Sequence, residues 1–321
     1  MARNPIQMQK GLSFSQFIEA YGTEEKCRAA ITLWRWPDGF VCPHCSGTAH
    51  AIVGRRRLYH CHGCRTQTSL ISGTVFAKTL LPLTKWFQGM YLLTQAKNSI
   101  SGLELARQLG VRPDTASLMR HKLMSVMAGR EASRKLDGRV EMDDVVLGGA
   151  RGVLEGGKQG RAGPNKTPFV VAVATDDDGH PQRLLLHVVK THDGAEIEAM
   201  ARAHLEPTAH VVTDGLGCFR AVTRIGCTHT AVNVTKADQH GEKLACFRWA
   251  NTIVANVKTS IAGTLKSVAK RYVYRYLAEF QYRFNRRADL PAMLARLGYV
   301  ATHAAPRPRK SLKIKRVYAR G

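Results

Sequence analysis

The second half of the chain alternates apolar strand-like runs with a helix-like segment, and this order constrains the fold more than any other feature of the sequence. Two apolar runs, Phe169–Thr175 and Arg183–Val189, flank an acidic Asp-Gly turn and predict a hairpin. A strand at Arg139–Val146 precedes the hairpin. A helix capped by Asp193 follows it and leads to a last strand at His210–Thr213. Continuous apolar strands that alternate with helices favour a mixed α/β fold over an all-β fold.

Acids lie on the first of these strands and directly after the last. Asp143 and Asp144 are neighbours on the first strand, and Asp214 follows the strand that ends at Thr213. A strand, a hairpin, a helix and a strand with acids at these two points is the ribonuclease H-like order, so we expect that fold class for this half. Carboxylates suit Mg²⁺, a hard cation that prefers oxygen ligands. Because two such ions about 4 Å apart support in-line phosphoryl transfer, the pattern predicts a metal-dependent nuclease site.

A third segment, Phe247–Lys266, repeats apolar residues at helical spacing. Asn251 and Lys258 are seven residues apart, which places them on one face of the expected helix, two turns apart. The distance along the chain from Asp214 suits a third ligand that arrives at the site on a long helix.

Two Cys-x-x-Cys pairs lie in the first third of the chain, Cys42 with Cys45 and Cys61 with Cys64. Each pair supplies two thiolates from one tight turn, and four thiolates complete a tetrahedral zinc site. The spacing therefore predicts a zinc ribbon in which all four residues hold structural Zn²⁺. Metal is favoured over disulfides because the chain shows no export signal. Three neighbouring histidines remain alternative ligands: His44, His60 and His62.

A helix that ends at Gly110 and a second helix that begins at Pro113 predict a helix-turn-helix within Ser101–Met127. The apolar residues that give the second helix a buried face are Ala116, Met119, Leu123 and Val126. The polar residues expected to face outward, toward DNA, are Asp114, Thr115, Ser117, Arg120 and His121. Helical pairs with no role in DNA binding share this pattern. Three basic residues between the cysteine pairs fit either a solvated turn or a clamp for DNA phosphates: Arg55, Arg56 and Arg57.

Charge is the strongest global signal. The chain of 321 residues holds 48 Lys and Arg against 24 Asp and Glu, a formal net charge of +24. Basic side chains that neutralise phosphates release counterions, so DNA is the expected partner, with a ribosome-associated or unspecific binding protein as the alternative. No apolar run approaches the roughly 18 residues of a membrane helix, and the N-terminus lacks the apolar core of a signal peptide. We expect a cytoplasmic protein that lies on the nucleoid when bound to DNA.

Four stretches carry a resemblance to a known family: MDDVVLGG, VVTDGLGCF, WANTIVANVKTSIAGTLK and the run Tyr276–Arg287, YLAEFQYRFNRR. Together with the cysteine pairs, they resemble bacterial insertion-sequence transposases that join a zinc ribbon and a helix-turn-helix to a DDE-type catalytic domain. The resemblance implies a DNA transposase that binds the terminal inverted repeats of its element, cleaves strands by hydrolysis with Mg²⁺ or Mn²⁺, and joins 3′-hydroxyl ends to target DNA. It also implies at least a homodimer on DNA, because two ends must be paired.

The resemblance further implies roles for individual residues. The family's spacing between the acid and the two glycines selects Asp143 over Asp144 as the first metal ligand, and Asp214 maps to the second. The third position, Glu in many relatives, holds Asn251, as in the Asp-Asp-Asn variant. The lysine seven residues later, Lys258, is expected to contact a DNA phosphate. Asp144 stands where the family usually has Glu and would be a secondary contributor. An amide oxygen can ligate Mg²⁺ but brings no charge, so weaker metal binding is expected.

Alternatives remain open for the site and for the function. Glu242 and Asn256 are the other candidates for the third ligand. A structure-selective ribonuclease H-like nuclease would cut DNA without joining ends. A transposase-derived DNA-binding regulator would have become weak or inactive with the loss of the third carboxylate. Two further basic segments are a glycine-rich insert at 148–168, expected to be flexible and near DNA, and the tail at 303–321, expected to be a disordered arm or another contact to the DNA backbone.

These features divide the chain into five predicted parts. Helical spacing in Ser13–Leu33 and in Leu83–Thr94 predicts further helices ahead of the catalytic half. The predicted parts are an N-terminal helical segment (1–34), a zinc ribbon (35–72), a helical DNA-binding part with the helix-turn-helix (73–130), a ribonuclease H-like catalytic domain (131–300) and a basic tail (301–321).

Overall fold

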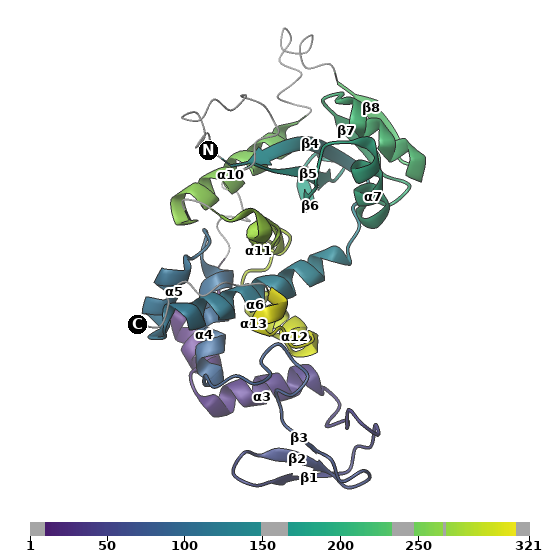
Figure 1. The fold of residues 1–321 in the computed structure, drawn as a ribbon. Helices are drawn as coiled ribbons and strands as arrows, with labels where there is room; N and C mark the ends of the chain where they lie inside the picture. The colour runs from purple at the N-terminus through teal and green to yellow at the C-terminus, as the bar shows by residue number, and fades with distance from the viewer. Residues whose placement is uncertain (1–9, 149–165, 233–246, 266–267, 313–321) are drawn as a thin grey trace. The chain divides into compact units, whose positions relative to one another are not determined.

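The computed structural model describes residues 10–148, 166–232, 247–265 and 268–312 (Figure 1). The chain splits into two compact units, one of Met1–Val126 with Arg287–Gly321 and one of Met127–Arg286, and each is taken by itself. Within the described ranges no helix is long and apolar enough to cross a membrane. Most of the predicted glycine-rich insert and the last nine residues of the predicted tail lie outside the described residues.

The first unit combines helices with a small antiparallel sheet. Its helices are α2 (Phe14–Tyr21), α3 (Glu24–Arg35), α4 (Leu83–Gln95), α5 (Gly102–Leu109), α6 (Pro113–Ala132, whose last residues belong to the second unit), α12 (Met293–His303) and α13 (Arg309–Leu312). Its sheet has the order β1 (His50–Val53), β2 (Leu58–Cys61), β3 (Gln67–Thr68). Three of the helices begin where a hydroxyl accepts a backbone N–H of the first turn, at Ser13, Thr23 and Ser101. The helices predicted from apolar spacing are confirmed.

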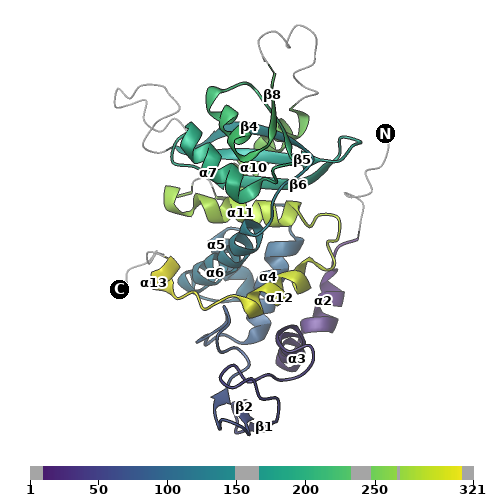
Figure 2. The same cartoon turned by 90° about the vertical axis from the view of Figure 1, so that its right-hand side faces the viewer.

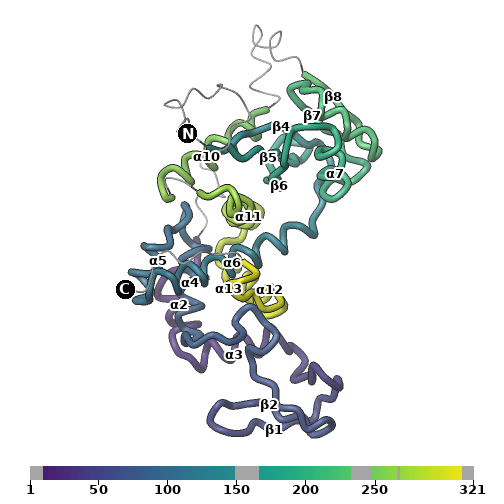
Figure 3. The backbone as a smooth tube through the Cα atoms, viewed as in Figure 1, coloured from purple at the N-terminus to yellow at the C-terminus, as the bar shows by residue number. Residues whose placement is uncertain are grey.

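The C-terminal helix α12 completes the core of the first unit. Trp34 of α3 stacks on Phe87 of α4, with ring centroids 5.5 Å apart. Gly298 of α12 lies against the same indole, and a Cβ at this position would come within 2.1 Å of the Trp34 ring. Only glycine allows this approach, and α12 lies next to α3 in Figure 3.

The chain beyond α12 also packs on the first unit. Leu312 is buried, and Arg309 donates a hydrogen bond from Nη2 to the backbone oxygen of Asp114 at 3.3 Å. The alternative of a disordered arm is therefore wrong for residues 304–312, because Leu312 is buried and Arg309 binds Asp114 of α6.

The second unit is built on a five-stranded mixed sheet. Its strands are β4 (Arg139–Leu147), β5 (Thr167–Thr175), β6 (Pro181–Val188), β7 (His210–Thr213) and β8 (Thr228–Ala231), and their order is β6-β5-β4-β7-β8. Strand β5 is antiparallel to both neighbours, whereas β4, β7 and β8 run parallel. This is the ribonuclease H-like arrangement, and the predicted fold class is confirmed. Strand β8 was not predicted, because its sequence, Thr-His-Thr-Ala, carries no apolar pattern.

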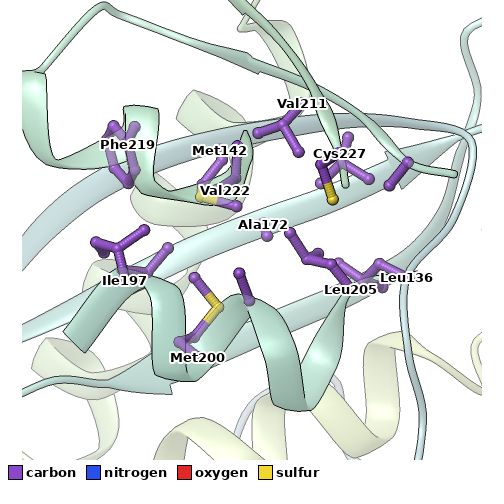
Figure 4. Packing of buried hydrophobic residues seen from close by; sticks show 14 of the residues in the cluster. Leu136, Met142, Ala172, Ile197, Met200, Leu205, Val211, Phe219, Val222 and Cys227 are labelled. Carbon is purple, nitrogen blue, oxygen red and sulfur yellow. The ribbon is translucent and has the colours of Figure 1, made fainter. Parts of the chain in front are cut away.

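Helices cover both faces of this sheet. One face packs on α7 (Gly194–His204) and the 3₁₀ helix η2 (Gly217–Ile225), and Figure 4 shows residues of this core, Met142 and Ala172 from the sheet and Ile197 and Met200 from α7 among them. The other face packs on α10 (Arg248–Leu265) and α11 (Val273–Phe284), which follows the short η3 (Lys270–Tyr272). The elements can be followed in Figures 1 and 2. Side chains alternate along β4, so Val140 and Met142 face α7 while Val145 faces α10.

Helix α11 closes the edge strand β6 with two amide side chains. Gln281 Oε1 accepts the N–H of Leu186 at 2.9 Å. Asn285 Oδ1 accepts the N–H of Leu184 at 2.7 Å, and its Nδ2 donates to the Leu184 oxygen at 2.9 Å. The buried carboxylate of Glu131 binds Asn285 Nδ2 in turn, at 2.6 Å. Because an open edge strand can pair with other chains, these bonds give part of the distinctive run Tyr276–Arg287 a structural role.

Replacing Asn285 by alanine is expected to destabilise the second unit. The substitution leaves two backbone groups of β6 and the Glu131 carboxylate without this partner, which costs about 1–3 kcal/mol of unfolding free energy. Urea denaturation followed by circular dichroism measures the effect. Gln182→Ala, at an exposed amide of the same strand, is the control and should change the stability by about 0.5 kcal/mol or less. Equal effects of the two variants would contradict the role of Asn285.

Candidate metal centres

Strands β4 and β7 bring three carboxylates together at one point of the sheet. The two strands pair in parallel from Arg139 with His210 to Glu141 with Val212, and Asp143 and Asp214 follow just beyond this ladder. One oxygen from each of Asp143, Asp144 and Asp214 lies within 4.8 Å of the others, among the described residues. The two acids expected from the sequence to converge are thus neighbours in space.

Local hydrogen bonds hold two of these carboxylates. Asp143 Oδ1 accepts the backbone N–H of Asp144 at 2.8 Å. Asp214 Oδ1 accepts the N–H of Leu216 at 3.0 Å, a turn that Gly215 allows with its φ of +85°. The chain therefore turns sharply after β7, while the carboxylate of Asp214 remains in the cluster.

The side chain of Asp144 is buried, although its neighbour Asp143 is a predicted metal ligand. Its side chain is 4% exposed, and Oδ2 lies 3.6 Å from Nδ1 of His192. The Nε2 atom of that histidine lies 3.3 Å from the backbone oxygen of Phe169. His192 was not predicted, because a single histidine between a strand and a helix carries no pattern. A half-buried thiol also borders the cluster: burial raises the pKa of Cys218, and the charges of Asp144 and Asp214 act in the same direction.

The donor set fits a hard divalent cation. All three groups are carboxylates, the ligand type that Mg²⁺ and Mn²⁺ prefer. Three such charges within 4.8 Å of one another repel each other, and a divalent cation between them would offset the repulsion. Oxygen-rich chemistry of this kind does not suit zinc as well as the thiol cluster of the first unit does.

The four predicted thiol ligands form a second cluster, in the first unit. Cys42 Sγ lies 3.6 Å from Cys64 Sγ, and Cys45 Sγ lies 3.5 Å from Cys61 Sγ. Tetrahedral zinc with Zn–S bonds of about 2.3 Å places sulfur atoms about 3.8 Å apart, so the geometry fits. Among the described residues this cluster contains the four cysteines, without any of the three neighbouring histidines.

Hydrogen bonds act in opposite directions on two of the thiols. The side chain and backbone of Thr66 lower the pKa of Cys64 to about 6, whereas for Cys45 the hydrogen bond of the Gly47 backbone is outweighed by those with Cys61 and Cys64, which raise its pKa to about 11. Metal binding requires the thiolate form. The backbone N–H of Ser46 donates a hydrogen bond to the backbone oxygen of Cys42, and that of Arg65 donates to the backbone oxygen of Cys61. Each bond closes a tight turn at one cysteine pair.

Comparison with known proteins places these two clusters in one family. Residues 135–285 match the model of the ISXO2-like transposase domain, and residues 22–67 match the model of the transposase zinc-ribbon domain. The first match contains the three acids, and the second contains the four cysteines. The chain is an insertion-sequence transposase with an N-terminal zinc ribbon and an ISXO2-like transposase domain.

One curated relative and one solved structure add context. An uncharacterized protein in transposable element ISH50 of Halobacterium salinarum is 27% identical over 135 residues, which is 40% of this chain and 44% of the relative. The chain thus matches less than half of that protein. The crystal structure of a pre-cleavage Mos1 transpososome has 10% sequence identity and a TM-score of 0.22, over 63% of this chain and 76% of that chain.

The third predicted ligand lies on the helix that packs beside Asp143. Asn251 is exposed in the first turns of α10, and Asn256 and Lys258 are exposed further along the same helix. Helix α10 packs on the sheet face that Asp143 shares with Val145, since side chains alternate along β4. The alternative ligand Glu242 lies outside the described residues.

The helix-turn-helix prediction is confirmed in its helices but wrong in part of its outward face. Helix α5 ends at Gly110 with φ +62°, and α6 begins at Pro113. However, Arg120 is 2% and His121 is 5% exposed, and Arg120 donates from Nη2 to Ser99 Oγ at 2.5 Å.

Burial on all sides of α6 explains this error. Six consecutive residues, 119–124, are buried, so α6 is surrounded at this level. Apolar spacing reveals one packed face of a helix and does not reveal a second one. Thr115 and Ser117 remain half-exposed, and Arg55, Arg56 and Arg57 are exposed at the tip between β1 and β2.

Replacing Cys64 by serine is expected to abolish zinc binding by the ribbon. The serine keeps the size of the side chain but removes the thiolate, and ribbons of this type owe much of their folding free energy to the metal. Metal analysis of the purified protein should fall from about one zinc per chain to almost none. Cys218→Ser, outside the thiol cluster, should retain the zinc. An unchanged zinc content in Cys64→Ser would refute the assignment.

Proposed function

We propose that this transposase binds the terminal inverted repeats of an insertion sequence, cleaves DNA strands by Mg²⁺-dependent hydrolysis and joins the 3′-hydroxyl ends to target DNA. The observation that carries the proposal is the convergence of Asp143, Asp144 and Asp214 inside the matched transposase domain. No other part of the described chain gathers carboxylates in this way.

The carboxylates of Asp143 and Asp214 would hold the cation, with the amide oxygen of Asn251 as a third ligand. When bound, a pair of Mg²⁺ ions about 4 Å apart lowers the barrier to in-line attack by stabilising the charge on the attacking and leaving oxygens. Lys258 lies on the same helix face as Asn251, two turns on, where its ammonium group would bind a DNA phosphate. The attacking water or hydroxyl can release its proton to solvent. No covalent bond between DNA and the protein is required.

Two successive phosphoryl transfers account for the reaction. In the first, a water oxygen bonds to a phosphorus at the element end, the bond to the 3′ oxygen breaks, and a free 3′-hydroxyl results. In the second, that 3′ oxygen bonds to a phosphorus of the target strand and displaces a target 3′ oxygen. One site serves both steps, because the nucleophile and the leaving group are oxygens each time.

Asp144 would supply the charge that Asn251 lacks. A site with Asp143, Asp214 and Asn251 has two formal negative charges, and the carboxylate of Asp144 within the same cluster raises this to three. His192 lies beside the Asp144 carboxylate, with Nδ1 3.6 Å from Oδ2. The Asp-Asp-Asn site of this chain would thus recover part of the metal affinity of a three-acid site.

Binding of the inverted repeats would rest on the first unit. The exposed arginines Arg55, Arg56 and Arg57 lie on the zinc ribbon, and Thr115 and Ser117 remain accessible on the second helix of the helix-turn-helix. The net charge of +24 favours a polyanionic partner. At least a homodimer is needed on DNA, because joining requires two ends in one complex.

A second candidate function is supported by the third ligand position. Asn251 carries no charge, as expected for a transposase-derived DNA-binding regulator that has lost catalysis. Such a protein would bind element ends without cutting them. A structure-selective nuclease would cut but would not join.

Strand transfer with purified protein, Mg²⁺ and cognate element ends tests the proposal. Asp143→Asn and Asp214→Asn keep the side-chain size but remove a metal-binding charge, so each should lower the rate on the order of 100-fold or more. Asp177→Asn is the matched control, since this exposed acid lies on the hairpin between β5 and β6 and should leave the rate unchanged.

Other outcomes identify the rivals. Full activity in Asp143→Asn or Asp214→Asn would overturn the site. Cleavage without joining would identify a nuclease. An inactive wild type beside an active Asn251→Glu variant would identify the regulator.

A further inference from the structure

We propose that Glu141 is a positioning residue, which holds the first turn of α10 and thereby sets Asn251 beside Asp143. The inference rests on the proposed function, because it assigns Glu141 a role toward the third metal ligand. Glu141 lies on the catalytic strand two residues before Asp143, and its side chain is buried (1% exposed).

The Glu141 carboxylate caps a helix from a different element. Its Oε2 accepts the backbone N–H of Trp249 at 2.9 Å and of Ala250 at 3.1 Å. These N–H groups belong to the first turn of α10, where a helix has no internal acceptors for them. A negative charge at a helix N-terminus is also favourable to the helix dipole. The start of α10 is therefore tied to one point on β4.

Further contacts fix the helix and leave Glu141 no role as a metal ligand. Arg139 binds the other carboxylate oxygen, Oε1, at 3.1 Å. Both oxygens are thus engaged, and Glu141 is absent from the cluster formed by Asp143, Asp144 and Asp214. The indole of Trp249 donates to the oxygen of Gly179 at 2.7 Å, a second anchor on the hairpin between β5 and β6.

Asn251 adjoins the turn that Glu141 caps, and Glu141 lies two residues before Asp143. Glu141 and Asp143 lie on the same face of β4, roughly 7 Å apart along the strand. Asn251 follows Ala250, so it lies only about 1.5 Å further along the helix axis than the capped turn. Beyond it, Ile253 and Val257 pack in the same core as Val145 of β4. Helix α10 thus packs on the sheet face that carries Glu141 and Asp143.

A neutral ligand depends on such positioning more than a charged one does. A glutamate at the third position would be drawn to the cation by its charge, whereas the amide of Asn251 must be held in place. The clamp between β4 and α10 supplies that constraint. Loss of the clamp should therefore weaken metal binding in a protein that contains Asn251. It should have no further effect in a variant that lacks this side chain.

A double-mutant cycle on the full-length, zinc-loaded protein tests this dependence. Mn²⁺ affinity, measured by the electron paramagnetic resonance signal of the free ion, and the cleavage rate at saturating Mn²⁺ are compared for Glu141→Ala, Asn251→Ala and the double variant. Each single change should raise the Mn²⁺ dissociation constant about 10-fold or more, and the double variant should be no worse than Asn251→Ala. Glu141→Gln keeps an acceptor oxygen and should restore most of the affinity.

The controls separate positioning from general damage. Glu196→Ala removes a comparable carboxylate, which accepts the N–H of Lys190 near the start of α7, and should leave Mn²⁺ affinity unchanged. Hydrogen exchange on the wild type needs no variant to fold: the amides of Trp249 and Ala250 should be protected although they lie in the first turn of a helix. Unprotected amides at both positions would overturn the clamp.

The remaining outcomes distinguish the two proposals. If Glu141→Ala weakens Mn²⁺ binding equally with and without Asn251, or if Asn251→Ala leaves the affinity unchanged, the positioning role is overturned while the acid site stands. If Asp143→Asn binds Mn²⁺ as tightly as the wild type, the proposed function itself fails.

Discussion

The parallel pairing of β4 with β7 is the constraint on which the candidate catalytic site depends. Parallel strands present corresponding ends at one edge, and the ladder ends with Glu141 opposite Val212. Asp143 and Asp214 continue the two strands from that point, so their carboxylates meet although 71 positions separate them in the sequence. The rest of the second unit stabilises this pair: α7 and η2 bury one face of the sheet, α10 and α11 bury the other, and the amides of α11 close its edge.

Side chains alternate between the two faces of β4, so the acids of this strand have different neighbours. Glu141 faces α10 and caps it, and Asp143 lies two residues on along the same face. Asp144 belongs to the opposite face and lies beside His192. One short stretch of sequence thus links a helix, a carboxylate cluster and a buried histidine. In the proposed site the arrangement matters because Asn251, a neutral side chain on α10, would have to be held in place by the helix that Glu141 caps.

Features with a strong local cause could be predicted from the sequence. The apolar runs of β5 and β6, the cap at Asp193 and the stop at Gly110 each act over a few residues. The cysteine pairs specify their own cluster, since four thiolates at that spacing suit one ion. Asp143 and Asp214 could be paired because the strand order implied that the two ends meet.

Other features depend on tertiary contacts that leave no local pattern. Arg120 and His121 were predicted to face outward because apolar spacing marks only one face of α6. In the structure the helix is covered on all sides at this level. Strand β8 has a polar sequence, and its strand structure comes from its pairing with β7. The chain near Arg309 was judged by its charge, although Leu312 anchors it. The role of Glu141 also escaped prediction, because a glutamate within a strand does not reveal that it caps a helix 107 positions later.

The catalytic site is tested most directly by the position of Mn²⁺ in a crystal of the full-length protein, located by anomalous scattering. We expect a peak in contact with carboxylate oxygens of both Asp143 and Asp214, in addition to zinc between the four cysteines. A crystal in which Mn²⁺ binds elsewhere and leaves these two carboxylates without a metal would contradict this expectation.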